Sequence, residues 1–328
     1  MDYLALALQG DYQGALSFLA QEKTRNEVME QALEYALGSV EEPPSAEGLN
    51  GEALAFVLML QATNAIEKND CAAAMTTLRA AITVARPVSP ELTAQLLAQL
   101  ATLESENIAL AIQHLREAIG LAEGMAKADL LLQLGIALQD AAHGSKAALL
   151  EAVKAYQESL RFGITIESKP ESFALLQNNL ALAYLAMPMT EAGDQLRIGI
   201  AVQSLREALK VYTKENYPEQ WASAQLNLAN ALQYIPTSHP EENLIQAVEI
   251  YDEILAVRTK AFDPVGYARL LANQANALAH LGIFSPAMEK ISEAYKLFQW
   301  HDEPEMAAAA MGLVENISQQ RGHANGSA

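Results

Sequence analysis

Three asparagines are spaced so that their side-chain amides could act together as one binding surface. Asn179, Asn227 and Asn273 follow one another at intervals of 48 and then 46 residues. An amide offers both a donor and an acceptor, so it can satisfy a peptide group without requiring a particular neighbouring side chain. The candidate partner-binding set also contains Leu182, Asn230, Gln233, Arg269, Asn276 and His280, and Gln133 is an earlier member of the amide series. This set predicts binding of a protein or peptide rather than covalent chemistry.

Residue types that carry catalysis or bind metals are dispersed in this chain. The six histidines are scattered, no H-E-x-x-H motif occurs, and both kinds of glycine-rich phosphate loop are missing from the sequence. Carboxylate pairs such as Glu241 and Glu242 fit the first turn of a helix, where acidic groups are stabilising. The single cysteine, Cys71, is expected to be a buried, inert thiol. We therefore expect a protein that is not an enzyme, with no cofactor and no metal site.

Each asparagine lies on a segment that begins with the same short phrase. The phrase reads Pro170-x-x-Phe173-Ala174, Pro218-x-x-Trp221-Ala222 and Pro264-x-x-Tyr267-Ala268, and each asparagine follows six residues after the aromatic. Proline is favoured in the first turn of a helix, so each copy predicts a helix start. A repeat period of this length is typical of stacked helical arrays. The repeated phrase therefore predicts that equivalent amides are aligned on successive helices.

One copy shows how the helices pair. From Pro218 onward, apolar residues recur at steps of three and four, as in Trp221, Ala224 and Leu228, which places them on one helical face. Pro236 and Pro240 interrupt this pattern, and a second helix is expected over residues 241–260. Small residues at Ala229 and Ala247 would let the two backbones approach closely. The segment therefore predicts an antiparallel helix pair.

These positions resemble the tetratricopeptide repeat. The resemblance is carried by Asn227-Leu228-Ala229 followed by Ala247-x-x-x-Tyr251-x-x-Ile254-Leu255, with matching copies around Asn179, Asn273 and Gln133. The longer stretch from Ala208 to Leu232 looks like the long repeats of bacterial proteins that carry CHAT protease or signalling ATPase domains. Members of this family fold as all-α, right-handed superhelical solenoids of stacked antiparallel helix pairs. The match covers residues 52 to 300 and is strongest from 127 to 300.

The resemblance also implies where a partner would bind. In this family the first helices of the repeats line a concave groove, and an asparagine at the place of Asn179 often bonds the backbone of an extended peptide. Leu182 would supply an apolar floor beside it. The alternative is that these amides bond a neighbouring helix within the array, and the sequence leaves both readings open. Some relatives clamp a C-terminal carboxylate with paired basic residues, but here only Arg269 is available.

The chain divides into segments of different regularity. We expect an N-terminal helical segment at 1–40, a loop at 41–51, degenerate repeats at 52–126 and well-formed repeats at 127–300. A capping helix is expected at 301–320, since a repeat array needs its end face covered, followed by a tail at 321–328. Extra residues at 187–199 and 236–243 are candidates for a lid.

Bulk composition narrows the classes of partner. The formal net charge of −19 and the presence of only 21 basic residues argue against nucleic acid and anionic membranes. One cysteine, no signal-peptide pattern and no apolar span predict a cytoplasmic location. We expect a protein-interaction scaffold, such as an adaptor, an assembly or maturation chaperone or a regulatory subunit, whose partner is a basic or neutral segment and could be an enzyme. The alternative is a ligand- or peptide-sensing regulatory protein that changes conformation on binding, and the chain could also pair with a second copy as a homodimer.

Overall fold

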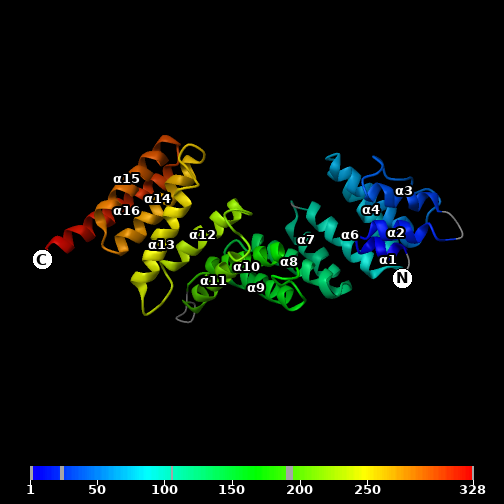
Figure 1. Cartoon of the computed structure of the whole chain (residues 1–328), viewed down its shortest axis with the longest axis horizontal. Helices are drawn as coiled ribbons and strands as arrows, with labels where there is room; N and C mark the ends of the chain where they lie inside the picture. Colours follow the sequence, from blue (N-terminus) through cyan, green and yellow to red (C-terminus); the bar gives the residue numbers. More distant parts are fainter. Residues whose placement is uncertain (1–2, 23–25, 105, 190–194, 327–328) are drawn as a thin grey trace. The chain divides into compact units, whose positions relative to one another are not determined.

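The computed structural model describes residues 3–22, 26–104, 106–189 and 195–326, and within them it contains sixteen α-helices and no β-strand. The chain divides into two compact units, in each of which the residues contact one another extensively. The all-α prediction is confirmed. The helices of the two units are coloured in chain order in Figure 1.

The N-terminal unit comprises residues 1–143 and 154–164. Its helices are α1 (Tyr3–Leu8), α2 (Tyr12–Leu19), α3 (Glu27–Ala36), α4 (Gly51–Glu67), α5 (Cys71–Ala85), α6 (Pro90–Leu103), α7 (Ile108–Leu121), α8 (Gly124–Asp140) and the C-terminal part of α9 (Lys146–Arg161). Sequential helices pack on one another, most extensively as the pairs α4 with α5 and α6 with α7. The N-terminal unit is therefore built of helix pairs, although its repeats are hard to recognise in the sequence.

The C-terminal unit comprises residues 144–153 and 165–328. Its helices are the start of α9, α10 (Pro170–Ala186), α11 (Gln195–Ala208), α12 (Pro218–Leu232), α13 (Pro240–Leu255), α14 (Pro264–His280), α15 (Phe284–Trp300) and α16 (Pro304–Gly326). The main pairs are α10 with α11, α12 with α13, and α14 with α15, and α16 packs on α15. In Figure 1 the last three helices lie side by side.

The local signals in the sequence explain where the helices begin and turn. The three prolines of the repeated phrase each occupy the first turn of α10, α12 and α14, where the missing N–H costs nothing. Between α14 and α15, Gly282 has φ +75°, and the N–H of the next residue, Ile283, donates to Leu278 O at 2.9 Å. A residue without Cβ adopts this left-handed conformation without strain.

Small residues at the helix crossings explain the close packing. Ala229 on α12 and Ala247 on α13 are fully buried, as is Tyr251, which the sequence assigned to the same interface. In the N-terminal unit the equivalent small residue is Gly135 on α8, and a Cβ placed there would lie 2.3 Å from the ring of Tyr156. The ring of Tyr156 therefore occupies the space that any larger side chain at position 135 would need.

Several expectations differ from the structure at the ends of elements. Helix α13 ends at Leu255 rather than at residue 260, because a turn closed by Asp263 N–H bonding Thr259 O leads into α14. Helix α16 continues to Gly326, so most of the expected tail is helical. Cys71 is exposed, not buried, because it occupies the first position of α5, after its N-cap Asp70. The expected lid at 187–199 includes residues 190–194, which lie outside the described residues, and residues 195–199 belong to α11.

Candidate partner-binding site

A pocket of about 770 Å³ lies among four helices of the C-terminal unit. Helices α12 and α14 supply its polar side, whereas α15 and α16 supply most of its apolar side. The lining residues are Asn230, Gln233, Tyr234, Arg269, Ala272, Asn273, Asn276, Ile291, Phe298, Met306, Ala309, Ala310 and Leu313. A concave, mostly apolar space with a few convergent polar groups is the usual form of a binding site.

Four amide side chains join α12 to α14 across this pocket. Asn273 Nδ2 donates to Asn230 Oδ1 at 3.0 Å, and Asn276 Nδ2 donates to Gln233 Oε1 at 2.9 Å. All four side chains are half-buried. We refer to Asn230, Gln233, Asn273 and Asn276 as the amide ladder. These bonds fix the orientation of each amide, because a donor on one helix meets an acceptor on the next.

The hydroxyl of Tyr251 on α13 forms hydrogen bonds with two residues of the amide ladder. It donates to Asn230 Oδ1 at 2.5 Å and accepts from Gln233 Nε2 at 2.7 Å. Burial raises the pKa of Tyr251 well above its ordinary value, with a smaller increase from Tyr234 and an opposing effect of the bond from Gln233. Tyr251 therefore stays a neutral hydroxyl that both donates and accepts.

Hydrogen-bonding capacity remains on the ladder after these contacts. An amide has two donor hydrogens and an acceptor oxygen, and the oxygens of Asn273 and Asn276 are not used by the bonds between the rungs. The same pocket is also lined by apolar residues: Ile291 and Phe298, which are buried, and Leu313, which is half-buried. Arg269 borders the pocket, and its Nε lies 3.2 Å from Met306 Sδ on α16. The pocket can thus bond a backbone on one side and bury an apolar side chain on the other.

Similarity to solved structures supports the helical-repeat interpretation. RapI in its apo form shares 11% identity with this chain, over 97% of this chain and 94% of RapI, with a TM-score of 0.57. The C-terminal part of a TPR repeat-containing protein from Cytophaga hutchinsonii shares 14% identity, over 90% of this chain and 94% of that one, with a TM-score of 0.51.

A third similar structure is much longer than this chain. It is a signal transduction ATPase with numerous domains and a tetratricopeptide repeat sensor, from Pyrococcus horikoshii. The identity is 14% and the TM-score 0.50, and the match covers 94% of this chain but only 42% of that one. No protein-family model and no curated protein matches the sequence.

The chain has a tetratricopeptide-repeat-like fold. The assignment to the long-repeat bacterial subtype remains a prediction from the sequence.

Five of the nine residues predicted to bind a partner line this one pocket. These are Asn230, Gln233, Arg269, Asn273 and Asn276. The other four lie outside it: Asn179 and Leu182 on α10 and Asn227 on α12 are half-buried, and His280 at the end of α14 is exposed. Asn179 accepts a long bond of 3.5 Å from Asn178 Nδ2.

The ladder is offset by one helical turn from the predicted alignment. The sequence places Asn227 and Asn273 at the same position of successive repeats, whereas the structure joins Asn273 to Asn230 and Asn276 to Gln233. These side chains bond the neighbouring helix, as one of the two readings expected, and they also line a pocket; binding of a partner by them stays a prediction. Because stacked helices are staggered along their axes, equivalent residues need not lie directly opposite one another.

Two parts of the pocket were not identified from the sequence. Tyr251 was read as a packing residue only, although its hydroxyl anchors two rungs. The wall formed by Met306, Ala309 and Leu313 belongs to α16, which was expected only to cover the last repeat. For Tyr251 the sequence did contain a signal. Tyr156 occupies the repeat position of Tyr251, and Gln139 occupies the position of Gln233. In the structure the Tyr156 hydroxyl donates to Gln139 Oε1 at 3.0 Å.

Neither a metal site nor a membrane span occurs among the described residues. No three His, Cys, Asp or Glu side chains of that part come together in a way that could hold a metal ion. Likewise, none of its helices combines the length and apolar character that crossing a bilayer would require.

Proposed function

We propose that this chain is a non-enzymatic protein-interaction scaffold that holds a segment of a partner protein on the amide ladder. The observation that carries the proposal is the combination of preorganised amides and apolar surface in one pocket. Within this role the chain would act as an adaptor, an assembly or maturation factor, or a regulatory subunit. The fold supports such a role because solenoid repeats present extended binding surfaces.

The pocket favours a particular mode of recognition. The oxygens of Asn273 and Asn276 would accept from backbone N–H groups of a partner segment, and an apolar side chain would enter between Phe298 and Leu313. Backbone bonds supply affinity in such complexes, whereas the side-chain pocket supplies specificity. The predicted residues outside the pocket, Asn179, Leu182, Asn227 and His280, would extend the same surface along α10, α12 and α14.

Two neighbouring alanines on α16 allow a matched test. Both Ala308 and Ala309 are exposed, but only Ala309 lines the pocket. The Ala309→Trp variant should fill the pocket while leaving all four ladder residues unsubstituted, whereas Ala308→Trp places the same side chain outside it. Affinity purification of the tagged chain from its native cell, with quantitative mass spectrometry, should recover a stoichiometric partner with the parent and with Ala308→Trp.

The expected effect of Ala309→Trp is a loss of that partner by at least about tenfold, since a central pocket contact is commonly worth 1.4 kcal/mol or more. Circular dichroism should show equal helicity for both variants. Equal recovery of the partner by both variants would show that this pocket is not the binding site, whatever the partner is.

One observation favours a second candidate, a regulator that senses a peptide or small ligand. Helix α16 forms one wall of the pocket and packs mainly on α15, so a bound ligand could shift it without disturbing the other helix pairs. The similar archaeal ATPase carries a repeat region described as a sensor. Thermal-shift screening of metabolites and peptides tests this candidate, because a ligand that binds the native state raises the melting temperature.

A further inference from the structure

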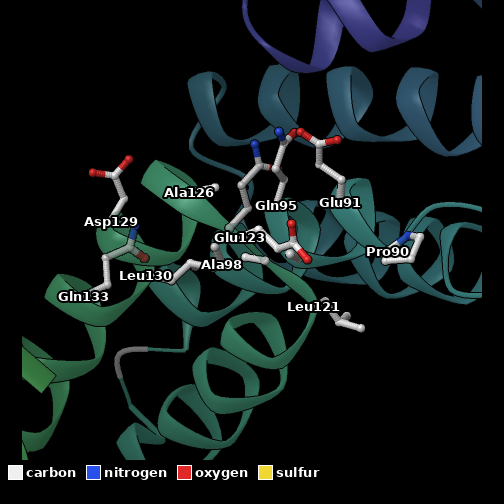
Figure 2. Close-up of a pocket in the computed structure, with 13 residues that line it drawn as sticks. Pro90, Glu91, Gln95, Ala98, Leu121, Glu123, Ala126, Asp129, Leu130 and Gln133 are labelled. Atoms are coloured by element: carbon white, nitrogen blue, oxygen red, sulfur yellow. The ribbon is translucent and has the colours of Figure 1, made fainter. Parts of the chain in front are cut away.

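A second pocket, of about 780 Å³, lies entirely within the N-terminal unit. Helix α6, the junction between α7 and α8, and helix α8 form its walls (Figure 2). Its lining residues are Pro90, Glu91, Ala94, Gln95, Ala98, Gln99, Leu121, Ala122, Glu123, Ala126, Asp129, Leu130 and Gln133. We refer to it as the acidic pocket, because three carboxylates and no Lys or Arg side chain belong to its lining.

Arg79, Arg86 and Lys127 interact with side chains that do not line this pocket. Arg79 bonds Glu104 at 3.2 Å, and Arg86 bonds Glu117 at 2.9 Å. Lys127, which lies on α8 between two lining residues, places its Nζ 5.0 Å from the centre of the Phe162 ring. The negative charge of the pocket is therefore not neutralised by these three side chains.

The side chains of Glu91 and Glu123 are both exposed, and neither carboxylate has an ion pair or hydrogen bond among the residues that the structure describes. Each lies at a helix start but does not cap the helix. Ser89 Oγ caps α6 by accepting from Leu92 N–H, which leaves the Glu91 carboxylate unused. Glu123 occupies the N-cap of α8 without any side-chain capping bond.

Figure 2 shows how these groups face one another. Glu91 and Gln95 lie side by side on α6, Glu123 lies below them in this view, and the carboxylate of Asp129 points away from the other two. Glu91 and Glu123, which come from different elements, thus line the same pocket.

The other lining residues supply polar atoms and apolar surface that suit a peptide with a long cationic side chain. Gln95 Nε2 donates to Leu8 O at 2.9 Å, which fixes this side chain and leaves its oxygen available. The Oε1 atom of Gln99 is buried and has no hydrogen-bond partner in the described structure. Ala94, Ala98 and Leu130 supply apolar surface on which an aliphatic stem would rest.

We propose that the acidic pocket binds a lysine- or arginine-bearing segment of a partner protein. The cationic head would pair with Glu91 and Glu123, and the amides of Gln95, Gln99 and Gln133 would bond the peptide backbone. A volume of about 780 Å³ exceeds the needs of a single side chain and suits a short segment. This inference rests on the proposed scaffold function and assigns it a second site with a defined partner chemistry.

The test uses the intact chain and a short fluorescent peptide of alternating lysine and alanine, measured by fluorescence anisotropy. The Glu91→Gln/Glu123→Gln variant removes two charges from the pocket. Its control, Glu106→Gln/Asp140→Asn, removes two charges from exposed residues of the same unit that do not line the pocket. Because both variants lose the same net charge, the general field of the acidic chain is matched.

The pocket variant should bind the peptide at least about tenfold more weakly, and the control should stay within about twofold of the parent. Equal weakening by both variants would mean that the peptide responds only to overall charge, and it would overturn the proposal. Spermine is the second arm: if it binds through Glu91 and Glu123 as tightly as the peptide does, the ligand class is a free amine and the segment proposal is wrong.

This outcome is separable from that of the scaffold proposal. The scaffold test reads the loss of a native partner on Ala309→Trp, in the C-terminal unit, whereas the peptide test reads Glu91 and Glu123 in the N-terminal unit. A chain that loses its partner on Ala309→Trp but binds the lysine peptide equally well in both carboxylate variants would retain the scaffold function and lose the acidic site.

Discussion

The side-chain amide of Asn273 on α14 donates to Asn230 Oδ1 on α12 at 3.0 Å, and the same oxygen accepts from the Tyr251 hydroxyl on α13. One acceptor atom thus joins three successive helices. Because two donors converge on it, the orientation of the Asn230 amide is determined by its neighbours. This relationship makes the polar side of the pocket rigid before any partner arrives, which reduces the ordering cost of binding.

Replacing Asn230 or Asn273 with aspartate should distinguish the residue that accepts this hydrogen bond from the residue that donates it. Asn230→Asp keeps an oxygen where two donors converge, so we expect a change in the free energy of unfolding below about 1 kcal/mol. Asn273→Asp replaces the donating nitrogen with an oxygen that faces Oδ1 of Asn230, and leaving a half-buried bond unmade should cost about 1–3 kcal/mol. Urea unfolding followed by circular dichroism measures both. An equal loss of stability in the two variants would contradict the assigned direction of this bond.

Removing the Tyr251 hydroxyl should weaken the ladder without opening the core. Tyr251→Phe keeps the fully buried ring but removes the hydroxyl that donates to Asn230 and accepts from Gln233. The expected cost is about 1–3 kcal/mol at neutral pH. Tyr234→Phe is the control, because this tyrosine is 64% exposed on the rim of the same pocket. If Tyr234→Phe loses as much stability as Tyr251→Phe, the Tyr251 hydroxyl has no specific stabilising role in the ladder.

The same pair of variants gives a pH dependence whose sign follows from the burial of Tyr251. The folded pKa is raised above its value in the unfolded chain, which is about 10. The stabilising contribution of the protonated hydroxyl is therefore present below about pH 10 and is lost as the pH rises further. The stability advantage of the parent over Tyr251→Phe should shrink between pH 8 and pH about 11. An advantage that stays constant over this range would show that the hydroxyl is not buried.

Two glycines of the N-terminal unit should respond to alanine with opposite signs. At Gly135 a new Cβ would meet the fully buried Tyr156 ring at 2.3 Å, so Gly135→Ala should lower the melting temperature, with a cost of about 1–3 kcal/mol from overpacking. At Gly120, inside α7, nothing lies within 4 Å of the added Cβ. Gly120→Ala should therefore stabilise the chain by about 0.5–1 kcal/mol through helix propensity. Differential scanning calorimetry of both variants is sufficient, and stabilisation by Gly135→Ala would refute the proposed crossing.

The fold was largely predictable because its signals are local. Proline in a first turn, apolar residues at steps of three and four, and small residues at Ala229 and Ala247 each require only a few neighbouring positions. The exposure of Cys71 was missed because it depends on the position at which α5 begins, and the helical continuation beyond residue 320 was missed because the polar composition there was read as a tail.

The candidate site was predictable in its chemistry but not in its geometry. The amide positions followed from the repeat, and four of the predicted amides meet in one pocket together with Arg269. The stagger that joins Asn273 to Asn230 rather than to Asn227 depends on how successive helices slide past one another. The acidic pocket combines residues of α6 with Glu123 at the start of α8, and this neighbourhood depends on how the pairs stack.

Site-specific photo-crosslinking in the native cell tests the central claim most directly. Benzoylphenylalanine in place of Tyr234 puts the crosslinker on the rim of the amide-ladder pocket, and the same residue in place of Phe262 puts it at a position that is 90% exposed and outside that pocket. We predict that the partner protein crosslinks to position 234 and not to position 262. A partner that crosslinks to position 262 while position 234 gives no product would contradict binding on the amide ladder.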